Sequence, residues 1–147
     1  VYCTNLAQQG IKDYGSMTRT QMELNQDGTV PSHTILNIND EMLTIAEWPN
    51  ITYTHIESVL PSDTGHAFTI KDYRMSRWTD VNGVVVYGTM RYEWRDDTLN
   101  VAKIDPVNRA VYTSNTSYYG LDSNANTWIK FINILDELDV LQKLVFI

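Results

Sequence analysis

Residues Val84–Asp97, which read VVVYGTMRYEWRDD, carry the strongest structural signal in this sequence. Alternate positions of the stretch are apolar apart from one glycine, whereas the positions between them are mixed or polar. The apolar set consists of Val84, Val86, Gly88, Met90, Tyr92 and Trp94. Alternation with period two predicts a long β-strand with one buried face, and therefore places Trp94 in the core. The Asn82-Gly83 pair just upstream suits a tight turn, so we expect the strand to enter from a hairpin.

Shorter segments on both sides of this stretch also alternate, and turn signals separate them about every 8–12 residues. The Asn39-Asp40-Glu41 stretch, for example, is expected to join two strands of a hairpin. This spacing is typical of an antiparallel sandwich or barrel. We expect an all-β fold, an antiparallel β-sandwich of the jelly-roll type. The expected strands are Val1–Thr4, Thr18–Leu24, Thr34–Ile38, Met42–Ala46, Ile51–Leu60, Ala67–Ile70, Leu99–Ile104 and Ala110–Ser114.

The last apolar segment changes period. Ile129, Ile132, Leu135 and Leu138 recur at every third residue, which predicts one short C-terminal helix. The apolar tail Val140–Ile147 would extend this helix or add a strand. Because an exposed apolar tail favours self-association, the sequence predicts a homodimer through the C-terminal segment.

The composition limits the partners of the chain. Its 147 residues suffice for a single domain spanning residues 1–147, and its net charge is −7. An acidic chain without a basic stripe disfavours nucleic acid and anionic membrane surfaces, because both bind clustered Lys and Arg. No segment approaches the roughly 20 apolar residues of a membrane helix, and no signal peptide is visible. We expect a module excised or truncated from a larger protein, and the sequence assigns it no localisation.

The sequence assigns no metal and no cofactor. Cys3 has neither a disulfide partner nor a zinc-binding neighbour, and burial as a small apolar residue is expected. The three histidines, His33, His55 and His66, lack the spacing of metal ligands. Residues Asp122–Asn126 carry oxygen atoms at alternate positions, as a calcium loop does, but the glycine and glutamate of such a loop are missing. A solvated turn is the favoured interpretation.

The four Trp and nine Tyr residues either fill a β core or form platforms for sugar rings. Trp48 lies beside a proline and a turn, and Trp78 follows two arginines, so these indoles are freer than Trp94 to face solvent. We expect a carbohydrate-binding site formed by Trp48, Tyr73, Arg74 and Trp78. Packing under loops, which is the default, and a domain interface are the alternatives.

Acidic residues gather in two places. Glu93 and Asp96 follow the long strand, and Asp136 and Glu137 lie near the C-terminus. A glycosidase needs two carboxyl groups on opposite sides of a bond, one of them with a raised pKa. One carboxyl from each group would make a small glycosidase, but solvated carboxylates are the simpler interpretation. We therefore assign no catalytic residue.

Several stretches, in order, resemble one protein family. They are VYCTNLAQQGIKDYG (1–15), LTIAEWPN (43–50), DYRMSRW (72–78), VYGTMRYEWRDD (86–97), VAKID (101–105), YYGLD (118–122) and INILDELD (132–139). Their order and spacing are similar to a segment of bacterial right-handed parallel β-helix proteins of the glycoside hydrolase type. The resemblance covers nearly the whole chain.

In that family the segment is a β-sandwich inserted into, or packed against, the early coils of a β-helix that degrades plant polysaccharides. The resemblance implies that the catalytic carboxylates belong to coils that follow this segment. The chain departs from the family pattern at Glu47, where an Arg usually precedes Trp-Pro-Asn. It departs again after Asp139, where the family continues with Pro-Gly-Glu-Trp-Tyr.

Together these observations favour a non-catalytic accessory module that binds a plant-type oligosaccharide weakly. The alternatives are a purely structural or interaction module that forms a homodimer and, less favoured, the small glycosidase. Exposure of both Trp48 and Trp78 on one face would favour sugar binding. Burial of both would favour the structural or interaction module.

Overall fold

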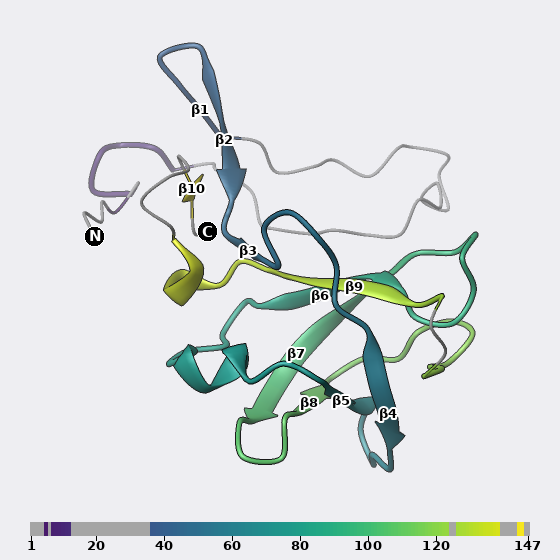
Figure 1. Cartoon of the computed structure of the whole chain (residues 1–147). Helices are drawn as coiled ribbons and strands as arrows, with labels where there is room; N and C mark the ends of the chain where they lie inside the picture. The colour runs from purple at the N-terminus through teal and green to yellow at the C-terminus, as the bar shows by residue number, and fades with distance from the viewer. Residues whose placement is uncertain (1–4, 6, 13–35, 124–125, 139–143, 146–147) are drawn as a thin grey trace.

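The computed structural model of the chain describes residues 5, 7–12, 36–123, 126–138 and 144–145. Strands dominate these residues, and both helical segments are short 3₁₀ turns, η1 and η2 (Figure 1). The elements are β1 (Leu36–Ile38), β2 (Glu41–Ile45), β3 (Glu47–Trp48), β4 (Ile56–Leu60), β5 (Ala67–Ile70), η1 (Arg74–Arg77), β6 (Val85–Thr89), β7 (Asp97–Asp105), β8 (Ala110–Thr113), β9 (Trp128–Ile132), η2 (Leu135–Glu137) and β10 (Leu144–Val145).

Seven strands form one antiparallel sheet that curls into a barrel (Figure 1). Their order is β3-β9-β6-β7-β8-β5-β4. The two outer strands belong to one bent path, because β3 pairs with β9 and Thr54, just before β4, exchanges two backbone hydrogen bonds of 3.1 and 2.9 Å with Ile129 of β9. The path then pairs with β5 through β4. Since one path meets both ends of the sheet, the buried side chains of all seven strands share one interior.

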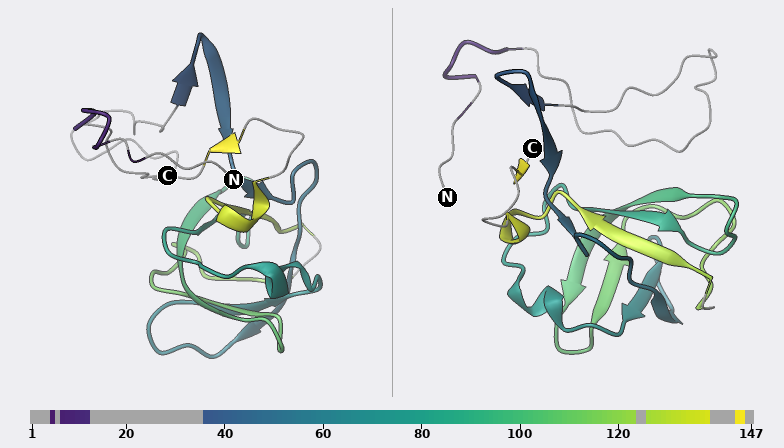
Figure 2. Two further views of the ribbon diagram at one scale, coloured as in Figure 1. Left: turned by 90° about the vertical axis from the view of Figure 1, so that its left-hand side faces the viewer. Right: turned by 45° about the horizontal axis from the view of Figure 1, so that its top comes forward.

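A smaller sheet, ordered β1-β2-β10, stands away from the barrel (Figures 1 and 2). Strands β1 and β2 form the expected hairpin, with Leu36 opposite Leu43. Asn39 and Asp40 have positive φ angles of 52° and 64°, the combination that two-residue hairpin turns require. β10 pairs in parallel with β2, so part of the C-terminal tail adds a strand, which was one of the two expected arrangements.

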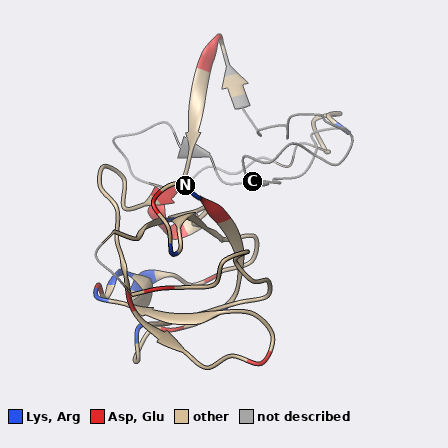
Figure 3. Ribbon diagram, turned by 90° about the vertical axis from the view of Figure 1, so that its right-hand side faces the viewer, with Lys and Arg blue, Asp and Glu red and all other residues tan. Residues whose placement is uncertain are grey.

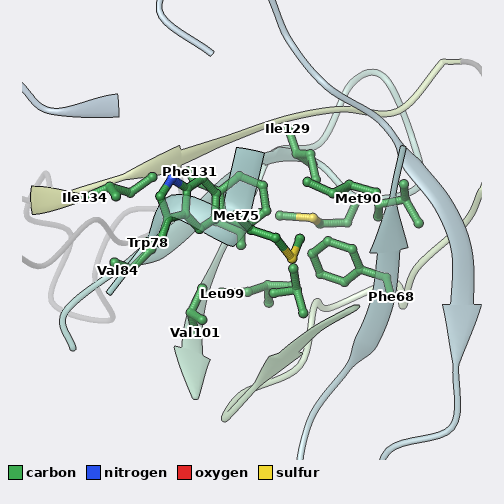
Figure 4. Packing of buried hydrophobic residues seen from close by; sticks show 14 residues of the cluster. Phe68, Met75, Trp78, Val84, Met90, Leu99, Val101, Ile129, Phe131 and Ile134 are labelled. Atoms are coloured by element: carbon green, nitrogen blue, oxygen red, sulfur yellow. The ribbon is translucent and has the colours of Figure 1, made fainter. Parts of the chain in front are cut away.

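The barrel interior is filled by one hydrophobic core (Figure 4). Each barrel strand from β4 to β9 contributes to it, and Met75 of η1 and Trp78 just after η1 cover one end. Removing such side chains from water stabilises the fold by about 1.5–3 kcal/mol each. The buried members are Ile56, Phe68, Ile70, Met75, Trp78, Val84, Val86, Met90, Leu99, Val101, Val111, Ile129, Phe131 and Ile134.

Strand β6 ends at Thr89, and this overturns the prediction that the alternation continues to Trp94. Gly88 has a φ of 148°, and a Cβ atom at this position would lie 2.0 Å from the carbonyl oxygen of Trp128. Only glycine permits this close approach to β9. Arg95 then donates its backbone N–H to the oxygen of Tyr92 (3.1 Å), so the chain turns back into β7. The apolar set of the stretch is therefore buried only as far as Met90.

The segment around Ile129 forms strand β9, so the predicted C-terminal helix is wrong. Ile129 and Phe131 face the core with no exposed surface, whereas Trp128 and Lys130, at the alternate positions of the strand, are partly exposed. A short apolar run satisfies the period of a strand and of a helix equally well. Pairing with both β6 and β3 decides for the strand. Among the described residues after β9, the helical segment is the single 3₁₀ turn η2.

The chain turns between β7 and β8 directly after Asp105, at Pro106. The Asp105 carboxylate accepts bonds from the backbone N–H groups of Val107 and Asn108, both 3.1 Å long, and from the Asn108 side chain at 2.7 Å. The Asn108 hydrogen bonds lower the pKa of Asp105, because they stabilise its charged form. This self-contained turn joins the two strands without help from the core.

The all-β antiparallel class is confirmed, and the barrel describes its arrangement, whereas the jelly-roll sandwich is not confirmed. Val81-Asn82-Gly83 does turn the chain, but it follows η1 and not a strand, so the expected hairpin entry is wrong. The expected strands Val1–Thr4 and Thr18–Leu24, and the expected burial of Cys3, lie outside the described residues. No helix among the described residues is long and apolar enough to cross a membrane.

Candidate functional site

Two loops at one end of the barrel carry a group of exposed aromatic side chains. The first, residues 90–96, joins β6 to β7, and the second, residues 114–127, joins β8 to β9. Thr89 pairs with Trp128, and Gly88 pairs with Asp97, so the barrel holds the loops next to each other. We call the side chains of Tyr92, Trp94, Tyr118 and Tyr119 the exposed aromatic cluster.

The four rings touch one another although they face solvent. Tyr92 and Trp94 stack with centroids 5.4 Å apart and an angle of 11° between their planes. Tyr119 meets both edge-on, at 5.5 and 5.3 Å, and Tyr118 packs against Tyr119 at 4.7 Å. Trp94 nevertheless keeps 69% of its surface exposed, and Tyr118 keeps 71%. Large aromatic surfaces gathered in solvent mark binding sites more often than chance.

Arginines tie the two loops together beneath and beside these rings. The Arg91 guanidinium lies 5.5 Å from the centre of the Tyr92 ring and donates to the backbone oxygen of Tyr119 at 3.3 Å. The Arg95 guanidinium lies 5.4 Å from the centre of the Tyr118 ring. Each arginine comes from the first loop and reaches a residue of the second, so the rings hold one arrangement.

A buried carboxylate anchors the second loop from below. Asp97 is only 2% exposed, and it accepts hydrogen bonds from the Ser117 hydroxyl and from the backbone N–H of Tyr118 (3.2 Å). The Arg95 side chain lies 3.8 Å from the other Asp97 oxygen. Asn115 adds two bonds to the backbone of β7, at 2.6 and 3.1 Å. The aromatic side chains are thus positioned before any ligand arrives.

A groove of about 340 Å³ runs beside the rings. Its walls combine aromatic faces with polar groups, namely Arg91, Tyr92, Glu93, Trp94, Asp122 and Asn126. Its volume lies in the range of small-ligand sites, which are about 300–1,000 Å³. The walls offer both apolar stacking and hydrogen bonding, which is the combination that a sugar ring requires.

The residues predicted to bind sugar occupy a different place. Trp78 is 5% exposed, so the expectation that it is freer than Trp94 to face solvent is wrong, and its indole N–H donates to Glu137 at 2.7 Å. Trp48 is half-buried against Trp78 and Phe131, with ring centroids 5.8 and 6.0 Å away. We call Trp48, Trp78 and Phe131 the buried aromatic cluster, and Figure 4 labels Trp78 and Phe131. Trp78 cannot stack on a ligand from this position.

Arg74 binds the same carboxylate as Trp78, that of Glu137. Its guanidinium donates two hydrogen bonds to the Glu137 carboxylate, at 2.7 and 2.6 Å, and this carboxylate is 1% exposed. The Asp136 carboxylate accepts bonds from the backbone and side chain of Thr79. Figure 3 shows the basic η1 in blue and the acidic η2 in red, which these bonds join.

Tyr73 is the one predicted site residue that is mostly exposed, at 64% of its surface. Its ring lies 5.1 Å from the Arg109 guanidinium at the turn between β7 and β8. The structure thus brings Trp48, Arg74 and Trp78 together as packing, and it leaves Tyr73 on the surface.

The structure does not bring the two acidic groups together. Glu93 and Asp96 lie in the loop after β6, whereas Asp136 and Glu137 follow the opposite end of the neighbouring strand β9. Asp96 accepts a bond from the Tyr87 hydroxyl (2.6 Å), and Glu137 is occupied by Arg74 and Trp78. Among the described residues, no group of three His, Cys, Asp or Glu side chains is arranged to hold a metal ion.

The sequence contains a signal for the exposed aromatic cluster, although the alternation of apolar residues points to the opposite conclusion for Trp94. Tyr92 and Trp94 are embedded in a charged run, RYEWRDD, and Tyr118 and Tyr119 lie in a polar loop. Aromatic residues among charges are more typical of a surface than of a strand interior.

Comparison of the chain with protein-family models, curated proteins and solved structures finds no match.

Proposed function

We propose that this chain is a non-catalytic carbohydrate-binding module whose sugar-binding face is the exposed aromatic cluster. One observation carries the proposal. Four exposed aromatic rings from two loops, held in one arrangement, stand beside a groove lined by carboxylate, amide and guanidinium groups.

The chemistry of the face suits a sugar chain. The C–H face of a pyranose stacks on the indole of Trp94, which is largely exposed. Hydroxyl groups at the ring edge donate to carboxylate and amide oxygens in the groove. Because Asp97, Arg91 and Arg95 already hold the loops, little conformational entropy is lost when the ligand binds.

The family resemblance supports an accessory role within a polysaccharide-degrading β-helix enzyme. Two of the stretches that carry the resemblance, residues 86–97 and 118–122, contain all four rings of the exposed aromatic cluster. In this proposal the ligand is a plant-type oligosaccharide, and bond cleavage belongs to β-helix coils that follow the segment. The acidic residues of η2 are used for packing, which favours a non-catalytic chain over a small glycosidase.

Isothermal titration with xylan, arabinan, glucan and pectin oligosaccharides tests this proposal. We expect saturable binding of at least one glycan, and we expect Trp94→Ala to weaken it by about tenfold or more, which is ~1.4 kcal/mol. Tyr73→Ala is the matched control, because it removes an exposed ring from a different surface. Equal losses in both variants, or no glycan binding at all, would reject the proposed face.

A structural or interaction module is the second candidate. Burial of Trp78 and partial burial of Trp48 are the observations that favour it, and the exposed rings would then pack against protein. The predicted homodimer through the C-terminal segment stays a prediction, since residues 139–143 and 146–147 lie outside the described part of the chain. Sedimentation at several concentrations distinguishes the two candidates. Self-association that Trp94→Ala abolishes, without glycan binding, would favour the interaction module.

A further inference from the structure

The charged side chains of the groove differ in whether they already have a partner within the protein. Arg91 is the one cation among the lining residues, and its guanidinium is occupied by the Tyr119 carbonyl and the Tyr92 ring. Glu93 and Asp122 are the two anions. Within the described part of the chain, neither of these carboxylates receives a hydrogen bond from another side chain. The negative charges are thus the ones left available to a ligand.

The position of Asp122 is fixed by the backbone. Its N–H donates to the oxygen of Met90 at 2.9 Å, which joins the second loop to the start of the first. Glu93 is exposed within the Tyr92–Arg95 turn. The two carboxylates therefore reach the groove from different loops, and both flank the space beside the Trp94 indole.

Two free carboxylates act differently on neutral and acidic sugars. An ionised carboxylate only accepts hydrogen bonds, and its bonds to neutral donors are stronger than those between uncharged groups. A neutral sugar presents several hydroxyl donors. A uronic acid residue instead brings a further carboxylate toward Glu93 and Asp122, in a chain whose net charge is already −7. Like charges brought together at a binding surface strongly oppose association.

We propose that the groove selects uncharged pentose or hexose chains and rejects uronic acid chains, with Glu93 and Asp122 as the specificity-determining residues. This inference rests on the proposed function, because it names the class of sugar that the exposed aromatic cluster receives. It requires no contribution from Arg91 beyond holding the loops.

The test compares neutral xylo- or gluco-oligosaccharides with galacturonan oligosaccharides of equal length. We expect the wild-type chain to bind the acidic series at least about tenfold more weakly. The difference should narrow between about 0.02 M and about 0.5 M salt, because salt screens exposed charges. Binding of the neutral series should change little with salt.

The double variant Glu93→Gln/Asp122→Asn should bind the acidic series several-fold better than the wild type and the neutral series no better. Asp40→Asn/Asp63→Asn removes two exposed charges elsewhere and should leave the preference unchanged. Galacturonan binding as tight as that of the neutral sugars, and lost in Trp94→Ala, would overturn the selectivity while the sugar-binding face stands. Failure of every glycan to bind would overturn both.

Discussion

The exposed and buried aromatic clusters use the same residue types for opposite purposes. Each cluster contains a tryptophan and has arginine and carboxylate side chains beside its rings. The two clusters lie at opposite ends of strand β6. In the buried aromatic cluster the carboxylate of Glu137 has both partners, Arg74 and Trp78, and almost no exposed surface. In the exposed aromatic cluster the arginines bind backbone and rings, which leaves groove carboxylates open to a ligand. A satisfied network stabilises a fold, whereas a partly satisfied one can bind.

Replacing an arginine in each cluster should separate their contributions most clearly. Arg74→Ala leaves the buried Glu137 carboxylate without its cation, and we expect the free energy of unfolding to fall by about 3 kcal/mol. Arg91→Ala removes a solvent-exposed arginine, so its effect on folding should stay below about 1 kcal/mol. Urea denaturation measures both. A loss for Arg91→Ala that equals that of Arg74→Ala would contradict the distinction.

A pair of tryptophan substitutions addresses the same contrast on a smaller scale. Trp78→Phe keeps an aromatic ring but removes the N–H that Glu137 accepts, which should cost about 1–3 kcal/mol of unfolding free energy. Trp94→Phe should change it by less than about 0.5 kcal/mol, because Trp94 is mostly exposed. Thermal unfolding of both variants would show whether one lowers the midpoint and the other does not.

Ser117→Ala should reduce stability less than Arg74→Ala does, while still affecting binding. The change removes one of the hydrogen bonds to the buried Asp97 carboxylate, but the Tyr118 N–H remains. We expect a loss of about 1 kcal/mol in stability and a several-fold weaker affinity for glycan, because the second loop is held less firmly. Calorimetry against the wild type measures the affinity. Unchanged binding would mean that the Ser117 hydroxyl is not needed to position the rings.

The sequence predicted those parts of the fold that depend on neighbouring residues. The β1–β2 hairpin follows from Asn39-Asp40, which tolerate positive φ, and β5 and the Asp105 turn follow from local pattern and turn chemistry. Gly88 shares the parity of the alternating apolar set, but its missing side chain allows a close approach of β9. That contact involves residues 40 positions apart, and no local period contains it.

The relative exposure of Trp78 and Trp94 differs from the prediction for a similar reason. Arg74 and Arg77 indicate a solvated segment when they are read next to Trp78. The fold supplies Glu137 from 59 residues away, and its carboxylate neutralises Arg74 and accepts the indole N–H. Trp94, with the parity of a core residue, lies instead beyond the point where the strand ends. Long-range partners, and not local propensity, determined which indole was buried.

The pairing of Thr89 with Trp128 and of Gly88 with Asp97 has a consequence for how such a protein evolves. The first loop leaves β6 and rejoins the barrel at β7, and the second loop rejoins it at β9, where main-chain pairing with β6 fixes the position of each strand. Most of their ring and groove side chains project away from the core, and the ion pair between Arg74 and the buried Glu137 carboxylate lies at the opposite end. Mutations in the loops can therefore change the binding surface without lowering the stability of the barrel. The same barrel can evolve to bind other ligands through substitutions in these two loops.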